Sequence, residues 1–108
     1  MTARRRLPNR RPSWSFGLEC GGLDYVCTHS HFSNGDLAEI FLSNHKSGSQ
    51  ADANSRDAAI LASICLQFGA PLDVVRKSLL RDSQDRPSTP VGVALDALAA
   101  IEAEGKKS

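Results

Sequence analysis

The sequence predicts a small α+β domain: a three-stranded antiparallel meander followed by three helices that pack on one face of the sheet. Three observations lead to this prediction. The first half alternates apolar and polar residues and is interrupted by the turn signals Gly21-Gly22 and Asn34-Gly35. The second half carries apolar residues at helical spacing. The length of 108 residues suffices for one hydrophobic core.

The predicted strands cover residues 13–20 (SWSFGLEC), 23–32 (LDYVCTHSHF) and 36–42 (DLAEIFL). Two-residue turns at both hairpins would set the register. The first hairpin would pair Trp14 with His29, Phe16 with Cys27 and Leu18 with Tyr25. The second would pair His31 with Ala38, His29 with Ile40 and Cys27 with Leu42. We expect the helices to cover the face that these mostly apolar residues share.

The predicted helices cover residues 51–69, 71–81 and 89–104. Gly69 and Pro71 form the stop signal between the first two. The apolar stripes that we expect to face the core are, in order, Ile60, Leu61, Ile64 and Phe68; Leu72, Val75 and Leu79; and Val91, Leu95, Leu98 and Ile101. The predicted organisation is an arm (1–12), one domain (13–104) and a short tail (105–108).

The arm is strongly basic. It contains Arg4, Arg5, Arg6, Arg10 and Arg11, whereas the rest of the chain has eight basic and twelve acidic residues. Prolines flank the arginines, so we expect an extended and poorly ordered segment. Such an arm binds phosphates, or it folds onto an acidic protein surface of its own chain or a partner.

The cysteines and the apolar runs of the sequence predict its cellular compartment. Its three cysteines have no repeated spacing, which is typical of reduced thiols in the cytoplasm. No apolar run approaches the ~18 residues of a membrane span, and the first residues lack the apolar region of a secretory signal. We therefore expect a cytoplasmic protein without membrane contact.

The segment CTHSHF offers two interpretations. Cys27, His29 and His31 could be metal ligands, because His-x-His on a strand is a known ligand geometry. Cys20 would lie ~13 Å away along the sheet, and no other motif supplies further ligands. We favour a core strand with a buried thiol and a buried histidine, and we expect neither a metal nor a cofactor in this chain.

The loop before the first helix is a candidate anion site. Lys46, Ser47, Gly48 and Ser49 precede a helix N-terminus, and Arg10 and Arg11 could add charge for a phosphate or nucleotide. The alternative, which we favour, is a helix capped by Ser47 or Ser49, with Asp52 complementing the helix dipole.

The second face of the sheet is not fully polar. Val26, Phe32, Leu37 and Phe41 are predicted to lie on it. They are either scattered surface residues or a surface for docking and self-association, and an open sheet also leaves edge strands for a dimer.

The sequence resembles the TSCPD domain, most closely over residues 34–79; this domain occurs at the C-terminus of cobalamin-dependent ribonucleotide reductases and as short standalone proteins. The resemblance rests on Gly35, Glu39, Ile40 and Phe41 in the third strand, Lys46 and Gly48 in the loop, the helix RDAAILASICLQFG, and Pro71, Leu72 and Val75 in the next helix. It extends over most of residues 7–98. The motif that names the family is altered, because Thr89 stands where its cysteine would be and Val91 replaces its acidic residue.

The resemblance implies a link to ribonucleotide reduction and DNA synthesis, and the label of a ribonucleoside-diphosphate reductase. It implies no catalysis by this chain, because the long enzymes carry their chemistry and their cobalamin in a large barrel that 108 residues cannot contain. Two functions therefore compete. The first is an accessory or regulatory domain that contacts the reductase large chain or binds a nucleotide. The second is a small nucleic-acid-binding protein that uses the arginine arm.

Overall fold

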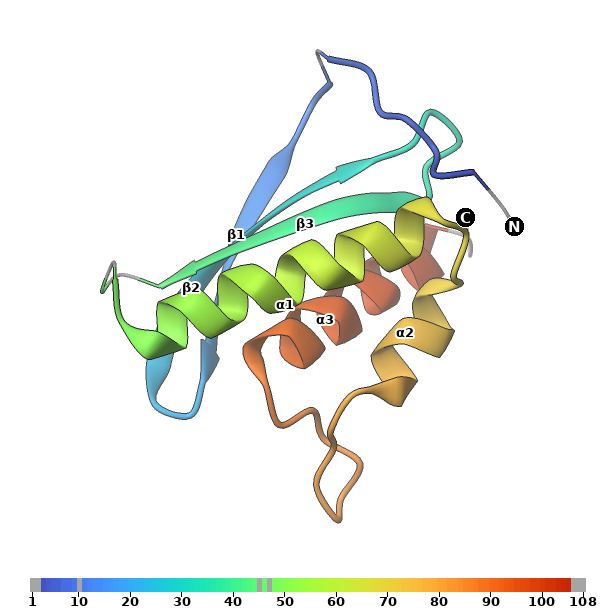
Figure 1. The fold of residues 1–108 in the computed structure, drawn as a ribbon. Coiled ribbons are helices and arrows are strands. Elements are labelled where there is room, and N and C mark those ends of the chain that lie inside the picture. The colour runs from blue at the N-terminus through green and yellow to red at the C-terminus, as the bar shows by residue number, and fades with distance from the viewer. Residues whose placement is uncertain (1–2, 10, 45, 47, 106–108) are drawn as a thin grey trace.

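The computed structural model describes residues 3–9, 11–44, 46 and 48–105. Its elements follow in the order β1 (Trp14–Cys20), β2 (Leu23–His31), β3 (Leu37–Asn44), α1 (Gln50–Gln67), α2 (Leu72–Ser78) and α3 (Pro90–Gly105). The strands form one antiparallel sheet in the order β1-β2-β3, and the helices lie on one side of it (Figure 1). The predicted fold class is confirmed. Within the described residues, no helix is long and apolar enough to cross a bilayer.

The first hairpin has the predicted register. Gly21 and Gly22 both have positive φ, at 60° and 79°, as a two-residue type I′ turn requires. Phe16 pairs with Cys27, and Leu18 pairs with Tyr25. Phe16 and Leu18 therefore pack against the core, as expected. The helices do not cover the whole face, however, because Trp14 at the start of β1 is 53% exposed.

The second hairpin keeps the predicted pairs His29–Ile40 and Cys27–Leu42 but departs from the predicted register next to its turn. Only Gly35 has positive φ in this turn (95°), and its N–H donates to the Phe32 carbonyl at 2.9 Å. The loop therefore has three residues, 33–35, rather than the two of a type I′ turn. A β-bulge absorbs the extra residue, so that His31 pairs with Leu37 and not with Ala38. Because neighbouring residues of a strand point to opposite faces, this shift moves Leu37 to the face that the helices cover.

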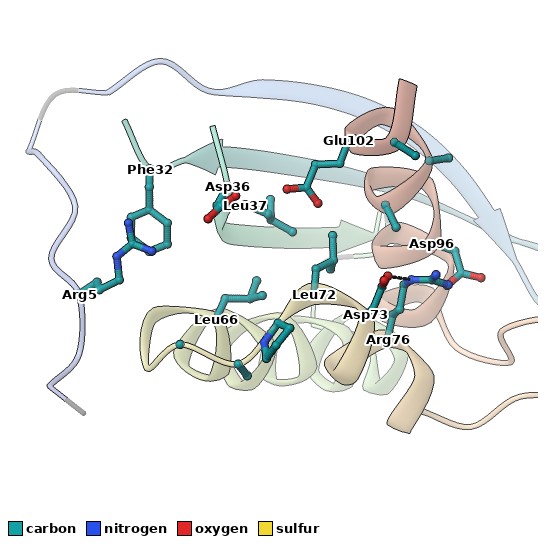
Figure 2. Close-up of a pocket in the computed structure, with 16 residues that line it drawn as sticks. Arg5, Phe32, Asp36, Leu37, Leu66, Leu72, Asp73, Arg76, Asp96 and Glu102 are labelled. Carbon is teal, nitrogen blue, oxygen red and sulfur yellow. Dashed lines mark hydrogen bonds and ion pairs between the residues drawn. The ribbon is translucent and has the colours of Figure 1, made fainter. Parts of the chain in front are cut away.

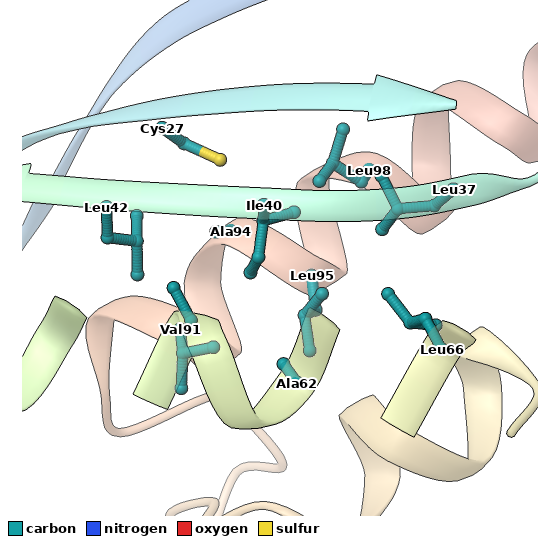
Figure 3. Packing of buried hydrophobic residues seen from close by; sticks show 11 residues of the cluster. Cys27, Leu37, Ile40, Leu42, Ala62, Leu66, Val91, Ala94, Leu95 and Leu98 are labelled. Carbon is teal, nitrogen blue, oxygen red and sulfur yellow. The ribbon is translucent and has the colours of Figure 1, made fainter. Parts of the chain in front are cut away.

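The core lies between the sheet and helices α1 and α3 (Figure 3). Cys27, Leu42 and Leu95 are its largest fully buried side chains. The core is small and mostly aliphatic, so individual leucines carry much of the burial energy of the domain. The buried residues of the cluster are Cys27, Leu37, Ile40, Leu42, Ala59, Ala62, Leu66, Val91, Ala94, Leu95 and Leu98.

Helix α1 runs along β3 (Figure 1). Polar side chains of α1 bind the outer edge of that strand. Ser63 Oγ accepts from the Ile40 N–H at 3.0 Å and lies 3.1 Å from the Ile40 carbonyl. Gln67 Nε2 donates to the Ala38 carbonyl at 3.1 Å. Near the other end of the strand, Asp52 Oδ1 accepts from the Asn44 N–H at 2.9 Å. These bonds use backbone groups of β3 that face away from β2.

The predicted apolar stripe of α1 is therefore wrong. Ile60 and Leu61 are 51% and 64% exposed, Phe68 is also exposed, and Ile64 is only half buried. The buried side is instead small and polar, because it packs closely against strand backbone and must satisfy its hydrogen bonds. Its buried residues are Asp52, Ser55, Ala59, Ala62, Ser63, Leu66 and Gln67.

Helices α2 and α3 follow the prediction more closely. Leu72, Val75 and Leu79 pack against the core, and Val91, Leu95 and Leu98 are buried within it. Ile101 is 55% exposed, so the last residue of the predicted stripe of α3 does not join the core. Asp96 of α3 accepts from Arg76 at 3.3 Å and from Arg81 at 2.7 Å, which ties α2 and the following loop to α3. The Arg81 hydrogen bond is the main cause that holds the pKa of Asp96 below its usual range.

Candidate functional site

The arm, meaning the described residues among 3–12, lies against the body of the domain. Arg4 Nε donates to Gln67 Oε1 at 2.6 Å, and the Arg5 N–H donates to the Gln67 carbonyl at 2.7 Å. The Arg5 guanidinium lies 3.5 Å from the centroid of the Phe32 ring, a cation–π geometry. Arg11 forms an ion pair with Glu39 and donates to Ser30 Oγ at 3.2 Å. The arm therefore joins the end of α1 to the second face of the sheet. Arg10 lies outside the described residues.

The residues predicted for a docking surface do not form one surface. Phe41 is 43% exposed on the second face, and Val26 is partly exposed there. Phe32 is only 7% exposed and lies under Arg5, and Leu37 is buried in the core. The assignment of Leu37 to the second face is wrong, because the three-residue loop and the bulge reverse its direction.

The two histidines of β2 hydrogen-bond to each other. His29 Nδ1 and His31 Nε2 are 2.8 Å apart, and His31 Nδ1 lies 3.0 Å from the Gly35 carbonyl. A carbonyl only accepts, so His31 Nδ1 carries a hydrogen, and in the neutral pair His29 Nδ1 donates to His31 Nε2. Burial, and secondly the charge of His31, lower the pKa of His29. Trp14 stacks on His29 with ring centroids 5.9 Å apart.

Cys27, the third candidate ligand, points into the core, and burial raises the pKa of its thiol to about 12. A thiol with that pKa stays protonated at neutral pH. Within the described part of the chain, no three His, Cys, Asp or Glu side chains form a group that could hold a metal ion.

The first turn of α1 supplies a carboxylate, Asp52, next to the loop that precedes the helix. Ser49 is the N-cap, and its Oγ accepts from the Asp52 N–H at 3.1 Å. The carboxylate of Asp52 accepts from the Asn44 N–H and from Arg56 Nε (2.8 Å), and these bonds lower its pKa. Gly48 has a φ of 83°, and Lys46 is exposed. The capped-helix alternative describes this loop; Ser47 lies outside the described residues.

Two concave regions flank the arm. One has a volume of about 800 Å³ and lies between the ends of α1 and α3 and the start of α2. In Figure 2 Arg5 and Phe32 mark one end of it, and Asp73, Arg76 and Asp96 mark the other. The second, which we call the arm groove, has a volume of about 680 Å³. It is lined by Arg4, Arg5, Arg6, Leu7, Asn9, Glu39, Ile40, Phe41, Ile60, Ser63, Ile64 and Gln67.

Neither the arm groove nor the roles of Ser63 and Gln67, which bind the edge of β3, were predicted from the sequence. A signal for the buried side of α1 was present. Asp52, Ala59, Ser63 and Leu66 recur at spacings of seven, four and three, which place them along one side of a helix. The larger apolar residues Ile60 and Leu61 give a stronger periodic signal, but they are exposed.

Comparison with known proteins identifies relatives of part of the chain. A vitamin B12-dependent ribonucleotide reductase of Agrobacterium fabrum is 36% identical over 70 residues, and that of Bradyrhizobium diazoefficiens is 33% identical over 73 residues. The reductase of Streptomyces coelicolor is 33% identical over 70 residues. The matched segments cover 65–68% of this chain.

The same segments are a small part of the relatives, 6–7% of the length of these three reductases. No protein-family model matches the chain, so the TSCPD resemblance stays a prediction. No solved structure matches it. The chain thus carries a domain that is similar to one short segment of vitamin B12-dependent ribonucleotide reductases.

Proposed function

We propose that this chain is an accessory domain of ribonucleotide reduction in the cytoplasm, and that it acts by contact with the reductase large chain rather than by its own catalysis. The observation that carries the proposal is the similarity to a short segment of the long reductases. In those proteins the matching segment is covalently part of the enzyme. A separate chain with the same fold would bind where that segment binds, or would compete with it.

The contacts of the arm support a protein-binding role over the nucleic-acid alternative. Arg4, Arg5 and Arg11 are engaged with Gln67, Phe32 and Glu39. If all five arginines bound phosphates, log affinity for duplex DNA against log salt would slope at about −4 to −5. If the three engaged arginines stay on the body, we expect a slope of about −1 to −2 and weak binding.

The test uses the full chain and a purified vitamin B12-dependent reductase large chain from the same cells. We expect the immobilised 108-residue chain to retain the large chain and to change its rate of ribonucleotide reduction. A reductase shortened by its own matching segment is the matched control, and we expect it to bind more tightly because the internal competitor is gone. No retention of either form, together with an unchanged rate, would reject the proposed function.

A further inference from the structure

The arm groove has an apolar floor that nothing in the described structure covers. Phe41 and Ile60 are 43% and 51% exposed, and Ile64 between them is half buried. Leu7 of the arm adds an apolar wall. Ile60 and Ile64 lie beside Ser63 and Gln67, which line the same groove and bind the edge of β3, so the two isoleucines are placed at the margin of that contact and not in the core. Exposure of these side chains is therefore built into the packing of the helix.

The rim of this floor is positively charged. Arg4, Arg5 and Arg6 line the groove, and Arg6 is exposed and takes part in none of the ion pairs or hydrogen bonds found among the described residues. The acidic residue of the lining, Glu39, is already paired with Arg11. A further guanidinium, that of Arg56, lies 5.0 Å from the centroid of the Phe41 ring.

We propose that the arm groove binds an acidic segment of a partner protein that presents aliphatic or aromatic side chains between its carboxylates. Charge complementarity selects the acidic groups, and the floor of Phe41, Ile60 and Ile64 selects the apolar ones. Single-stranded nucleic acid is bound on free aromatic faces, whereas two of these three side chains are aliphatic and the Phe41 ring faces Arg56. The identification of the partner as the reductase large chain rests on the proposed function. The preference of the groove for an acidic and apolar segment is argued from its lining residues alone.

The first experiment measures fluorescence anisotropy of labelled peptides with the full chain. The probe is an amidated peptide of alternating Glu-Glu and Leu-Leu pairs. One control replaces each Glu by Lys, a second replaces each Leu by Ala, and oligothymidylate serves as a polyanion without apolar side chains. We expect binding of the Glu/Leu peptide, at least about tenfold weaker binding of the Ala control, and none of the Lys control. Equal or tighter binding of oligothymidylate, or binding of the Lys control, would overturn the inference.

Variants of two neighbouring residues locate the site. Ile60→Glu should weaken binding of the Glu/Leu peptide about tenfold or more, because it places a carboxylate on the floor of the groove. Leu61→Glu is the matched control, since Leu61 is also exposed on α1 but does not line the groove. Arg6→Glu should weaken binding about threefold to tenfold. An equal loss in Leu61→Glu and Ile60→Glu would contradict the assignment. Both side chains are exposed, so circular dichroism should show a normal fold.

The same variants separate this inference from the proposed function. If the Glu/Leu peptide binds and the large chain does not, the groove stands and the reductase link fails. If the parent and Ile60→Glu chains retain the large chain equally, the link stands and the groove is not its site. Mass measurement in solution tests a second copy as the occupant: a parent dimer that becomes a monomer in Ile60→Glu would replace the partner proposed here.

Discussion

The two edge strands of the sheet, β1 and β3, differ in whether their outward backbone groups have hydrogen-bond partners. At β3, the backbone groups that face away from β2 are bound by side chains of α1: Gln67 binds Ala38, Ser63 binds Ile40 and Asp52 binds Asn44. At β1, the turn places Cys20 opposite Leu23 as a hydrogen-bonded pair. Because every second residue of an antiparallel strand bonds to the neighbouring strand, the N–H groups of Ser15, Gly17 and Glu19 point away from β2. None of the additional backbone hydrogen bonds in the described structure uses them.

The difference shows how a helix can close an edge strand. An open edge is a template for pairing with another chain, and proteins cover it with charges, bulges or other elements. Here a polar helix side closes β3, while β1 stays available. Self-association through an edge strand, which the sequence suggested, would therefore use β1. Matched measurements on β1 and β3 test this difference.

Amide hydrogen exchange should show the largest contrast. We expect the Ile40 and Asn44 amides to exchange on the order of a thousandfold more slowly than the outward amides of β1, because only the former have buried acceptors. Amide exchange measured by NMR over a range of protein concentrations also tests whether β1 pairs between two copies of the chain. Protection of the Gly17 amide that rises with concentration would indicate pairing of β1 between two copies. Fast exchange at Ile40 would show that α1 does not close the edge.

Truncation of equivalent leucines should differ by strand. Leu42 of β3 is fully buried, so Leu42→Ala should lower the free energy of unfolding by about 2–5 kcal/mol. Leu18 of β1 is only partly buried, and Leu18→Ala should cost about 1–2 kcal/mol. Urea denaturation measures both. Equal costs would mean that β1 is covered in solution, as it would be in a dimer.

Removal of a hydroxyl should also depend on the edge. Ser63→Ala leaves the buried Ile40 N–H without its acceptor and should cost about 1–3 kcal/mol. Ser15→Ala removes an exposed contact with Thr28 Oγ1 (2.9 Å) and should change stability by less than about 0.5 kcal/mol. A Ser63→Ala chain with the stability of the parent would show that water replaces the hydroxyl at this edge.

The smallest effect concerns pH. The hydrogen bond from Asn44, and then that from Arg56, depress the pKa of Asp52 below its ordinary value of 3.8. The unfolded chain thus binds the proton more readily, and the contribution of Asp52 is complete above pH 3.8 and is lost as the pH falls through its folded pKa. Asp52→Asn should flatten the fall in melting temperature below pH 3.8, and Arg56→Gln should flatten it less. An identical acid transition in parent and Asp52→Asn chains would contradict the role of this carboxylate.

The sequence predicted the elements better than their faces. The Gly21-Gly22 turn follows directly from the preference of glycine for positive φ, and the first hairpin was correct to the residue. Asn34-Gly35 carries a similar signal, but the observed loop is one residue longer than predicted. As a result, Leu37 lies on the face opposite to the predicted one. Periodicity could not show that α1 meets a strand edge, where Ser63 and Gln67 are more useful than Ile60 and Leu61. The packing of α1 against the edge of β3 is a tertiary contact, and the local sequence pattern of a helix does not reveal it.

The candidate site was the least predictable part. Five arginines in the arm indicated charge, but nothing in their spacing shows that Arg5 rests on Phe32 or that Arg11 reaches Glu39. Likewise, the His-x-His pattern of β2 fits two ligands or two hydrogen-bonded rings equally well. Only the distance between His29 Nδ1 and His31 Nε2 shows that the rings bind each other.

Gln67 holds the arm and the sheet with the same side chain. Its Oε1 accepts from Arg4, while its Nε2 donates to the Ala38 carbonyl at the bulge of β3. The position of the arm and the order of the strand edge are therefore linked equilibria, and thermodynamic reciprocity applies to them. A ligand that lifts the arm would change the hold of Gln67 on the bulge by the same coupling free energy by which a loosened bulge would change the hold of Gln67 on the arm. One amide group thus connects the most basic segment of the chain to the register of its sheet.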